Sequence, residues 1–129
     1  MKLRIRDNSI RVRLTRGEVT TLRDKGLVSS RTGFPGSREF RYMVESSPAS
    51  VKPGAFLSEG VVTVRLPETT VLAWASSEQV SIEGELLLDE GDKLAILVEK
   101  DFACLATREG EDESDMFPHP NADSDEGQC

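Results

Sequence analysis

Five cationic side chains near the N-terminus have the types and spacing that suit binding to a negatively charged partner. On both sides of a short turn, cations alternate with aliphatic residues, which places the two kinds of side chain on opposite faces of a strand. Asp7, Asn8 and Ser9 form the turn, because Asp, Asn and Ser bond locally to their own backbone. The segment therefore predicts a β-hairpin with one cationic face, made of Lys2, Arg4, Arg6, Arg11 and Arg13.

Two explanations of this cationic face stay open. In the first, the face binds an acidic macromolecule, either nucleic acid or protein, since Arg recognises phosphate and guanine and a two-stranded ribbon fits the major groove of DNA. In the second, the cations are neutralised inside the protein, by Glu residues on neighbouring strands or by the acidic C-terminal tail. Like charges on one face repel each other, so one of the two must offset that repulsion.

A second set of side chains could bind a metal. These are the weak candidates Cys104, Asp112, Asp115 and His119, which offer thiolate, carboxylate and imidazole donors. Zinc sites show closely paired ligands, and this set has no such spacing, so we favour a buried Cys104 and a solvated tail. A small metal protein or enzyme that uses Cys104, the tail carboxylates and His119 remains the alternative function.

The sequence gives little evidence for catalysis, so we favour a protein that is not an enzyme. We assign no catalytic residue and no cofactor. The one histidine, His119, lies between two prolines in the tail, where a base would lack rigid support. Glu83 and Glu85 share a face of one predicted strand, but an outward polar face of an edge strand explains them. The chain lacks a Gly-x-Ser-x-Gly, a phosphate-binding Gly loop ending in Lys-Ser/Thr, and a Cys-x-x-Cys.

The charge of the chain is divided unevenly. Residues 1–42 carry eleven Lys and Arg against four Asp and Glu, whereas residues 43–129 carry five against nineteen. Such a division suits acidic partners for the first part.

No run of about 18 apolar residues predicts a membrane span, the N-terminus does not resemble a signal peptide, and two isolated cysteines favour a cytoplasmic location. The oligomeric state is not predictable from these features.

The elements that must position these residues come from an internal repeat. Residues 9–32 and 61–84 show the same apolar pattern 52 residues apart, with identities that include Val12/Val64, Leu14/Leu66 and Val28/Val80. We therefore expect an α+β domain of two β-β-α-β units, forming a mostly antiparallel sheet or a small barrel with two short helices. Val12, Leu14, Val19 and Leu22 should be buried, as should Val64, Leu66, Val71 and Trp74.

The domain boundaries follow from composition. Residues 1–107 form the predicted single domain, and residues 108–129 are an acidic tail that we expect to be disordered, because it has few apolar residues to bury. Thr15 and Glu18 read as a capping box at the start of the first helix, and Gly26 as its end. Pro67 suits the first turn of the second helix.

Three stretches carry a resemblance to a known family: MKLRIRDNSIRVRLTRGEV, VTVRLPETTVLAWASSEQVSI and LAILVEKDFACL. They resemble a family of small uncharacterised bacterial proteins over nearly the whole chain, which implies a cytosolic, stand-alone protein without an assigned function. The first hairpin and its capped helix are also similar to AbrB/MazE-type swapped-hairpin domains. In that family two β-β-α-β chains interlock and basic strands meet DNA, which implies a pseudo-dimer here and a DNA-binding role for the five cations.

Overall fold

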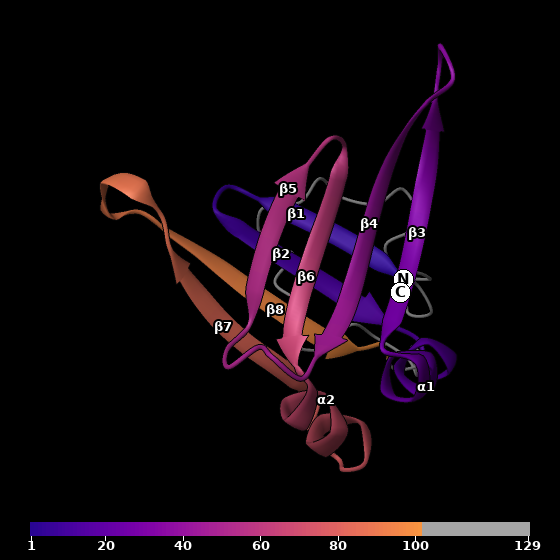
Figure 1. The fold of residues 1–129 in the computed structure, drawn as a ribbon, viewed down its shortest axis with the longest axis vertical. Coiled ribbons are helices and arrows are strands. Elements are labelled where there is room, and N and C mark those ends of the chain that lie inside the picture. The colour runs from indigo at the N-terminus through magenta and orange to yellow at the C-terminus, as the bar shows by residue number, and fades with distance from the viewer. Residues whose placement is uncertain (102–129) are drawn as a thin grey trace, which may run out of the picture.

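The structure is a computed structural model, and it describes residues 1–101. These residues form eight strands, two α-helices and one short 3₁₀ helix (Figure 1). In chain order the elements are β1 (Lys2–Arg6), β2 (Ser9–Leu14), α1 (Arg16–Lys25), β3 (Leu27–Phe34), β4 (Arg38–Ser47), β5 (Gly54–Ser58), β6 (Val61–Pro67), α2 (Glu68–Ala75), β7 (Ser81–Leu87), η1 (Asp89–Gly91) and β8 (Lys93–Lys100).

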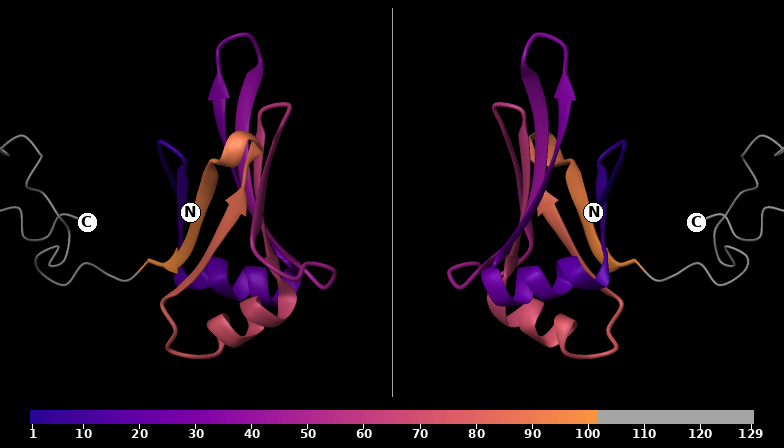
Figure 2. Two further views of the ribbon diagram at one scale, coloured as in Figure 1. Left: turned by 90° about the vertical axis from the view of Figure 1, so that its left-hand side faces the viewer. Right: turned by 90° about the vertical axis from the view of Figure 1, so that its right-hand side faces the viewer.

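The strands make two four-stranded sheets that lie one behind the other (Figures 1 and 2). Sheet A has the order β1-β2-β8-β7, and sheet B has the order β3-β4-β6-β5. In each sheet only the central pair is parallel, β2 with β8 and β4 with β6, and the other pairs are antiparallel. The fold is thus α+β and mostly antiparallel, as expected.

The small barrel is not formed by residues 1–101. Closure would require hydrogen bonds between the edge strands of the two sheets, and β1 and β7 of sheet A have no such partner in sheet B. The sheets instead pack through their inner faces. At one end, α1 and α2 lie side by side and cover the space between the sheets (Figure 2).

Each half of the chain contributes a hairpin to each sheet. Sheet A joins the first hairpin, β1–β2, to the last, β7–β8, whereas sheet B joins β3–β4 to β5–β6. Each half therefore reads β-β-α-β-β, with one strand more than the expected β-β-α-β unit. The hairpin of β3 and β4 extends beyond the rest of sheet B (Figure 1).

The core lies between the sheets and under the helices. All eight predicted core residues are buried, and Val44, Ile82, Ile96 and Val98 join them. Trp74 is fully buried, and its indole Nε1 donates a hydrogen bond to the carbonyl oxygen of Val80 at 2.9 Å. Aliphatic side chains and one Trp thus supply the core in a chain with few aromatic residues.

The start of α1 has the predicted capping box. The amide of Glu18 donates to Thr15 Oγ1 at 3.2 Å, and Glu18 Oε1 accepts from the amide of Thr15 at 2.9 Å. The amino group of Met1 also pairs with Glu18 Oε2 at 2.8 Å. Burial raises the pKa of Glu18, but the bonds from Met1 and Thr15 outweigh it, so the net pKa lies below its ordinary value. Gly26 ends α1 in the left-handed conformation, at φ 80°.

The second helix differs from the first in how it ends. The segment between α2 and β7 is longer than that between α1 and β3, and it shifts the strand that follows. Val28 is 7% exposed and lies opposite Val44, whereas Val80 is 46% exposed and Ile82 occupies the buried position opposite Val98. The predicted equivalence of Val28 with Val80 is therefore wrong by two residues. No helix within residues 1–101 is long and apolar enough to cross a membrane.

Candidate functional site

The five predicted cations share one surface, which we call the outer face of sheet A. This face consists of the side chains of the sheet that point away from sheet B, arranged in three rows across β1, β2, β8 and β7. The strand register gives the rows Lys2–Arg13–Glu99–Ser81, Arg4–Arg11–Leu97–Glu83 and Arg6–Ser9–Ala95–Glu85. The hairpin β1–β2 is thus cationic on this face, as the alternation predicted.

Three of the five cations have carboxylate partners within the fold. Arg13 Nε lies 2.7 Å from Glu99 Oε1, and Arg11 Nε lies 3.3 Å from the same oxygen. Lys2 Nζ lies 3.3 Å from Asp101 Oδ2. Glu99 pairs with two guanidinium groups because β8 lies directly beside β2. Its side chain is only 14% exposed. For these three cations the structure has the neutralising carboxylates that the second explanation requires.

The other two cations, Arg4 and Arg6, have no such partner in the part of the chain that the structure describes. Among residues 1–101, neither guanidinium lies within 4.0 Å of a carboxylate oxygen. Both residues are exposed, and Arg4 lies directly opposite Arg11, so that two like charges are neighbours. Ser9 Oγ donates to the carbonyl oxygen of Arg6 at 2.7 Å, which braces the turn beneath these side chains.

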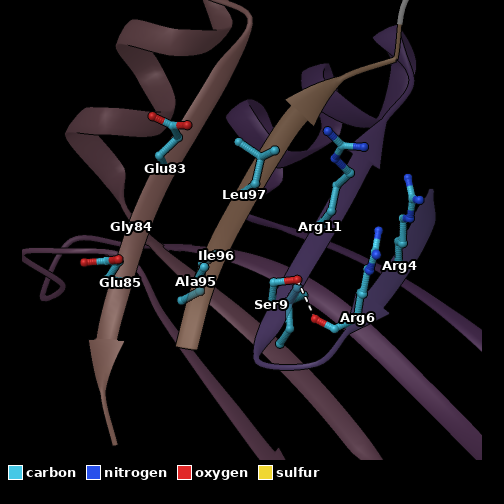
Figure 3. Close-up of a pocket in the computed structure, with 11 residues that line it drawn as sticks. Arg4, Arg6, Ser9, Arg11, Glu83, Gly84, Glu85, Ala95, Ile96 and Leu97 are labelled. Carbon is cyan, nitrogen blue, oxygen red and sulfur yellow. Dashed lines mark hydrogen bonds between the residues drawn. The ribbon is translucent and has the colours of Figure 1, made fainter. Parts of the chain in front are cut away.

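Arg4, Arg6 and Arg11 border a hollow of about 780 Å³ that runs across sheet A. Figure 3 shows the three guanidinium groups side by side on β1 and β2. Glu83 and Glu85 stand on β7 at the other side of the hollow, and Ala95 and Leu97 lie between the two sets of charges (Figure 3).

The carboxylates of β7 are weakly paired. Glu85 Oε1 lies 3.9 Å from Lys93 Nζ, and both side chains are mostly exposed, so this pair contributes little. Glu83 has no cationic nitrogen within 4.0 Å among residues 1–101. The outer face of sheet A is therefore dipolar: β1 and β2 are cationic, β8 carries Glu99 next to the apolar Leu97 and Ala95, and β7 is acidic.

Sequence reasoning found both charged sets but did not bring them together. The alternation of β1, β2 and β7 is visible in the sequence, and it correctly placed Glu83 and Glu85 on the outward face of an edge strand. The pairing of β2 with β8 joins residues more than 80 positions apart, and no local signal announces it. Glu99 was missed for the same reason.

Sheet B provides an internal comparison. Arg65 on β6 pairs with Glu45 on the adjacent parallel strand β4, just as Arg13 on β2 pairs with Glu99 on β8. The strand β5 lies beside β6 as β1 lies beside β2, but it carries Phe56 and Ser58 on its outer face and no cation. The guanidinium carbon of Arg65 lies over the ring of Phe56, 4.7 Å from the centroid of that ring. The outward cations of β1 are therefore not required to build such a sheet.

The candidate metal ligands Cys104, Asp112, Asp115 and His119, and the rest of the acidic tail, lie outside the described residues. Within residues 1–101, His, Cys, Asp and Glu side chains form no group of three or more that could hold a metal ion. The chemical groups of the outer face of sheet A are guanidinium groups, carboxylates and a hydroxyl, which bind charged ligands through ion pairs and hydrogen bonds.

Residues 1–121 match a family of unknown function, DUF7009. The chain belongs to this family. No curated protein and no solved structure matches the chain. Membership of the family agrees with the expected resemblance to an uncharacterised family, whereas nothing in the comparisons links the chain to AbrB/MazE-type domains.

Proposed function

We propose that this protein is a non-enzymatic binding module, and that the outer face of sheet A binds a macromolecule that presents carboxylates to Arg4 and Arg6. One observation carries the proposal. Lys2, Arg11 and Arg13 each have a carboxylate partner in the fold, whereas Arg4 and Arg6 have none among residues 1–101. Two neighbouring cations that no carboxylate of residues 1–101 neutralises can form charge-assisted bonds with a ligand.

The cost of holding these cations supports the proposal. Arg4 is directly opposite Arg11, and such a like-charge pair destabilises a sheet by a few tenths of a kcal/mol or more. The corresponding strand of sheet B shows that the fold does without cations there. A ligand with negative groups removes the repulsion when it binds.

A protein partner suits the face better than nucleic acid does. Glu83, Glu85 and Glu99 lie on the same face and would repel the phosphates of a duplex laid across the sheet. Residues 1–101 hold fifteen Lys and Arg against fifteen Asp and Glu, so this region has no net positive charge to attract DNA. A protein surface can present both signs of charge and match the whole face.

We also infer that the two halves of the chain are repeats that exchange hairpins. The support is the equivalent pairing of β2 with β8 and of β6 with β4, and the matching ion pairs Arg13–Glu99 and Arg65–Glu45. This exchange is the feature that AbrB/MazE-type swapped-hairpin domains would share with the chain, and it concerns architecture rather than DNA binding. A cytoplasmic location remains our expectation.

Binding of a short poly-glutamate peptide to the full chain tests the proposal, with a duplex DNA of similar charge as the second probe. We expect the peptide to bind at low salt, to dissociate as salt rises, and to lose affinity in the double variant Arg4→Gln/Arg6→Gln. The matched control is Arg16→Gln/Arg38→Gln, which removes the same charge from exposed positions elsewhere.

Three results would count against the proposal. Equal loss in both double variants would mean that net charge alone governs binding. Absence of peptide binding in the parent chain would remove the proposed surface. Tight DNA binding, with a log–log salt slope of about −0.9 for each phosphate contacted, would identify nucleic acid as the partner instead.

A further inference from the structure

We propose that the partner of the outer face of sheet A is a second copy of this chain, which packs face to face on the first around a two-fold axis. The inference rests on the proposed function, because it assigns the carboxylates that meet Arg4 and Arg6. They are Glu83 and Glu85 of the second copy.

The argument begins from the dipolar character of the face. Its cations lie on β1 and β2, and its weakly paired carboxylates, Glu83 and Glu85, lie on the opposite edge strand, β7 (Figure 3). A surface that is cationic on one side and acidic on the other is complementary to itself after a half-turn. A two-fold symmetric, isologous contact is the commonest way in which identical chains associate.

The direction of the axis follows from the charges. An axis parallel to the strands, passing between β2 and β8, places β1 of one copy over β7 of the other and β2 over β8. An axis perpendicular to the strands would place β1 over β1 and bring Arg4 and Arg6 against the cations of the second copy. Only the first arrangement brings opposite charges together.

The register shows that all three rows fit this arrangement. A half-turn about an axis along the strands keeps each row over its own counterpart. Arg4 then meets Glu83, Arg6 meets Glu85, and Arg13 meets Glu99 of the second copy. The remaining positions place Lys2 over Ser81, Arg11 over Leu97 and Ser9 over Ala95. No row brings two like charges together.

The size of the face predicts the strength of the contact. Packed sheets are rotated by about 30° and lie about 10 Å apart, a gap that long Arg and Glu side chains can span. Four strands and three rows cover about 20 Å by about 20 Å, or about 400 Å² on each copy, where a standard interface buries about 800 Å² per partner. We therefore expect a weak dimer that depends on protein concentration and on salt.

Sedimentation velocity of the full chain over a range of concentrations, with designed charge exchanges, tests this inference. The parent chain should shift from monomer to dimer as its concentration rises, and high salt should reverse the shift. The variants Arg4→Glu/Arg6→Glu and Glu83→Arg/Glu85→Arg should each be monomeric, because like charges then meet in their homodimers. An equimolar mixture of the two should form a heterodimer, since both contacts become complementary again.

A four-fold variant that combines both exchanges in one chain should recover the homodimer. All four side chains are exposed, so the fold should survive, and circular dichroism checks this. A parent chain that stays monomeric at every concentration would overturn the inference, as would a dimer that persists in both exchanged variants. If the parent is monomeric but binds poly-glutamate through Arg4 and Arg6, the second copy is wrong and the proposed function stands. If the parent chain neither dimerises nor binds poly-glutamate, the second-copy inference and the proposed function are both wrong.

Discussion

At the scale of single residues, the five cations of the first hairpin have separate roles. Arg13 and Arg65 occupy corresponding places in the two sheets, and each pairs with a Glu on the adjacent parallel strand. We interpret these two pairs as parts of the fold, because they occur on both outer faces. Arg4 and Arg6 have no counterpart in sheet B, and this difference is why we assign them to binding.

Glu18 gives a prediction about acid stability. Its pKa lies below the ordinary value of 4.5, so its bonds stabilise the folded state above that pH, and the contribution is lost as pH falls through the lowered pKa. Glu18→Gln keeps an amide oxygen that can accept the capping bond but removes the charge paired with the Met1 amino group, and it should cost about 0.3–1 kcal/mol near pH 7. Urea unfolding should show this difference shrinking at acid pH, as pH falls through the lowered pKa and the parent carboxylate becomes protonated. A difference that is equal at both pH values would contradict the assigned role of the carboxylate.

At the scale of elements, the contact between β7 and the start of β5 holds one corner of the two sheets together. Gly84 lies on β7, and a Cβ atom at this position would lie 2.7 Å from Pro53 Cβ. Pro53 is a rigid ring in the segment just before β5, and Gly84 lies within β7, so the backbone of one of them must shift to make room. Gly84 is therefore required by the close approach of the sheets.

Gly84→Ala should destabilise the protein by about 1–3 kcal/mol, which is typical of overpacking. Gly33→Ala is the matched control, because no atom lies within 4 Å of an added Cβ there and its φ is not positive. Urea unfolding of the two variants measures the difference. Equal stability of the two would mean that β5 and β7 are not held at this distance.

Local elements could be predicted from the sequence, but their assembly could not. The hairpins follow from strict alternation and turn residues, and α1 follows from its capping box and Gly26. The apolar run LAILV on β8 suits a central strand, and β8 lies between β2 and β7. The parallel pairings, and the dipolar face that results from them, depend on contacts between segments far apart in the sequence. The alternating patterns of the strands do not specify these contacts, and they are equally compatible with a barrel.

At the scale of the whole molecule, Trp74 is the largest fully buried side chain of residues 1–101, and its helix α2 contacts α1 and strands of both sheets. The Trp74 side chain is fully buried beside the connection to β7, and Lys100 Nζ lies 5.6 Å from its ring centroid. Its removal would leave a large cavity that small aliphatic neighbours cannot fill.

Trp74→Ala should cost about 3–5 kcal/mol, a large share of the stability of a domain of this size. Leu72→Ala on the same helix is the control, since Leu72 is 44% exposed and its loss should cost far less. Urea unfolding of both variants compares them. Similar costs would mean that α2 does not pack its Trp74 face against the sheets.

The most direct test of the proposed binding surface is a map of backbone amide NMR shifts as poly-glutamate is added to the labelled full chain. The proposal predicts that the shifts concentrate on β1 and β2 around Arg4, Arg6 and Arg11, and that they disappear in Arg4→Gln/Arg6→Gln. The outer face of sheet B, around Met43 and Phe56, should stay unchanged. Shifts that concentrate on sheet B or on the helices, with β1 and β2 unaffected, would contradict the proposal.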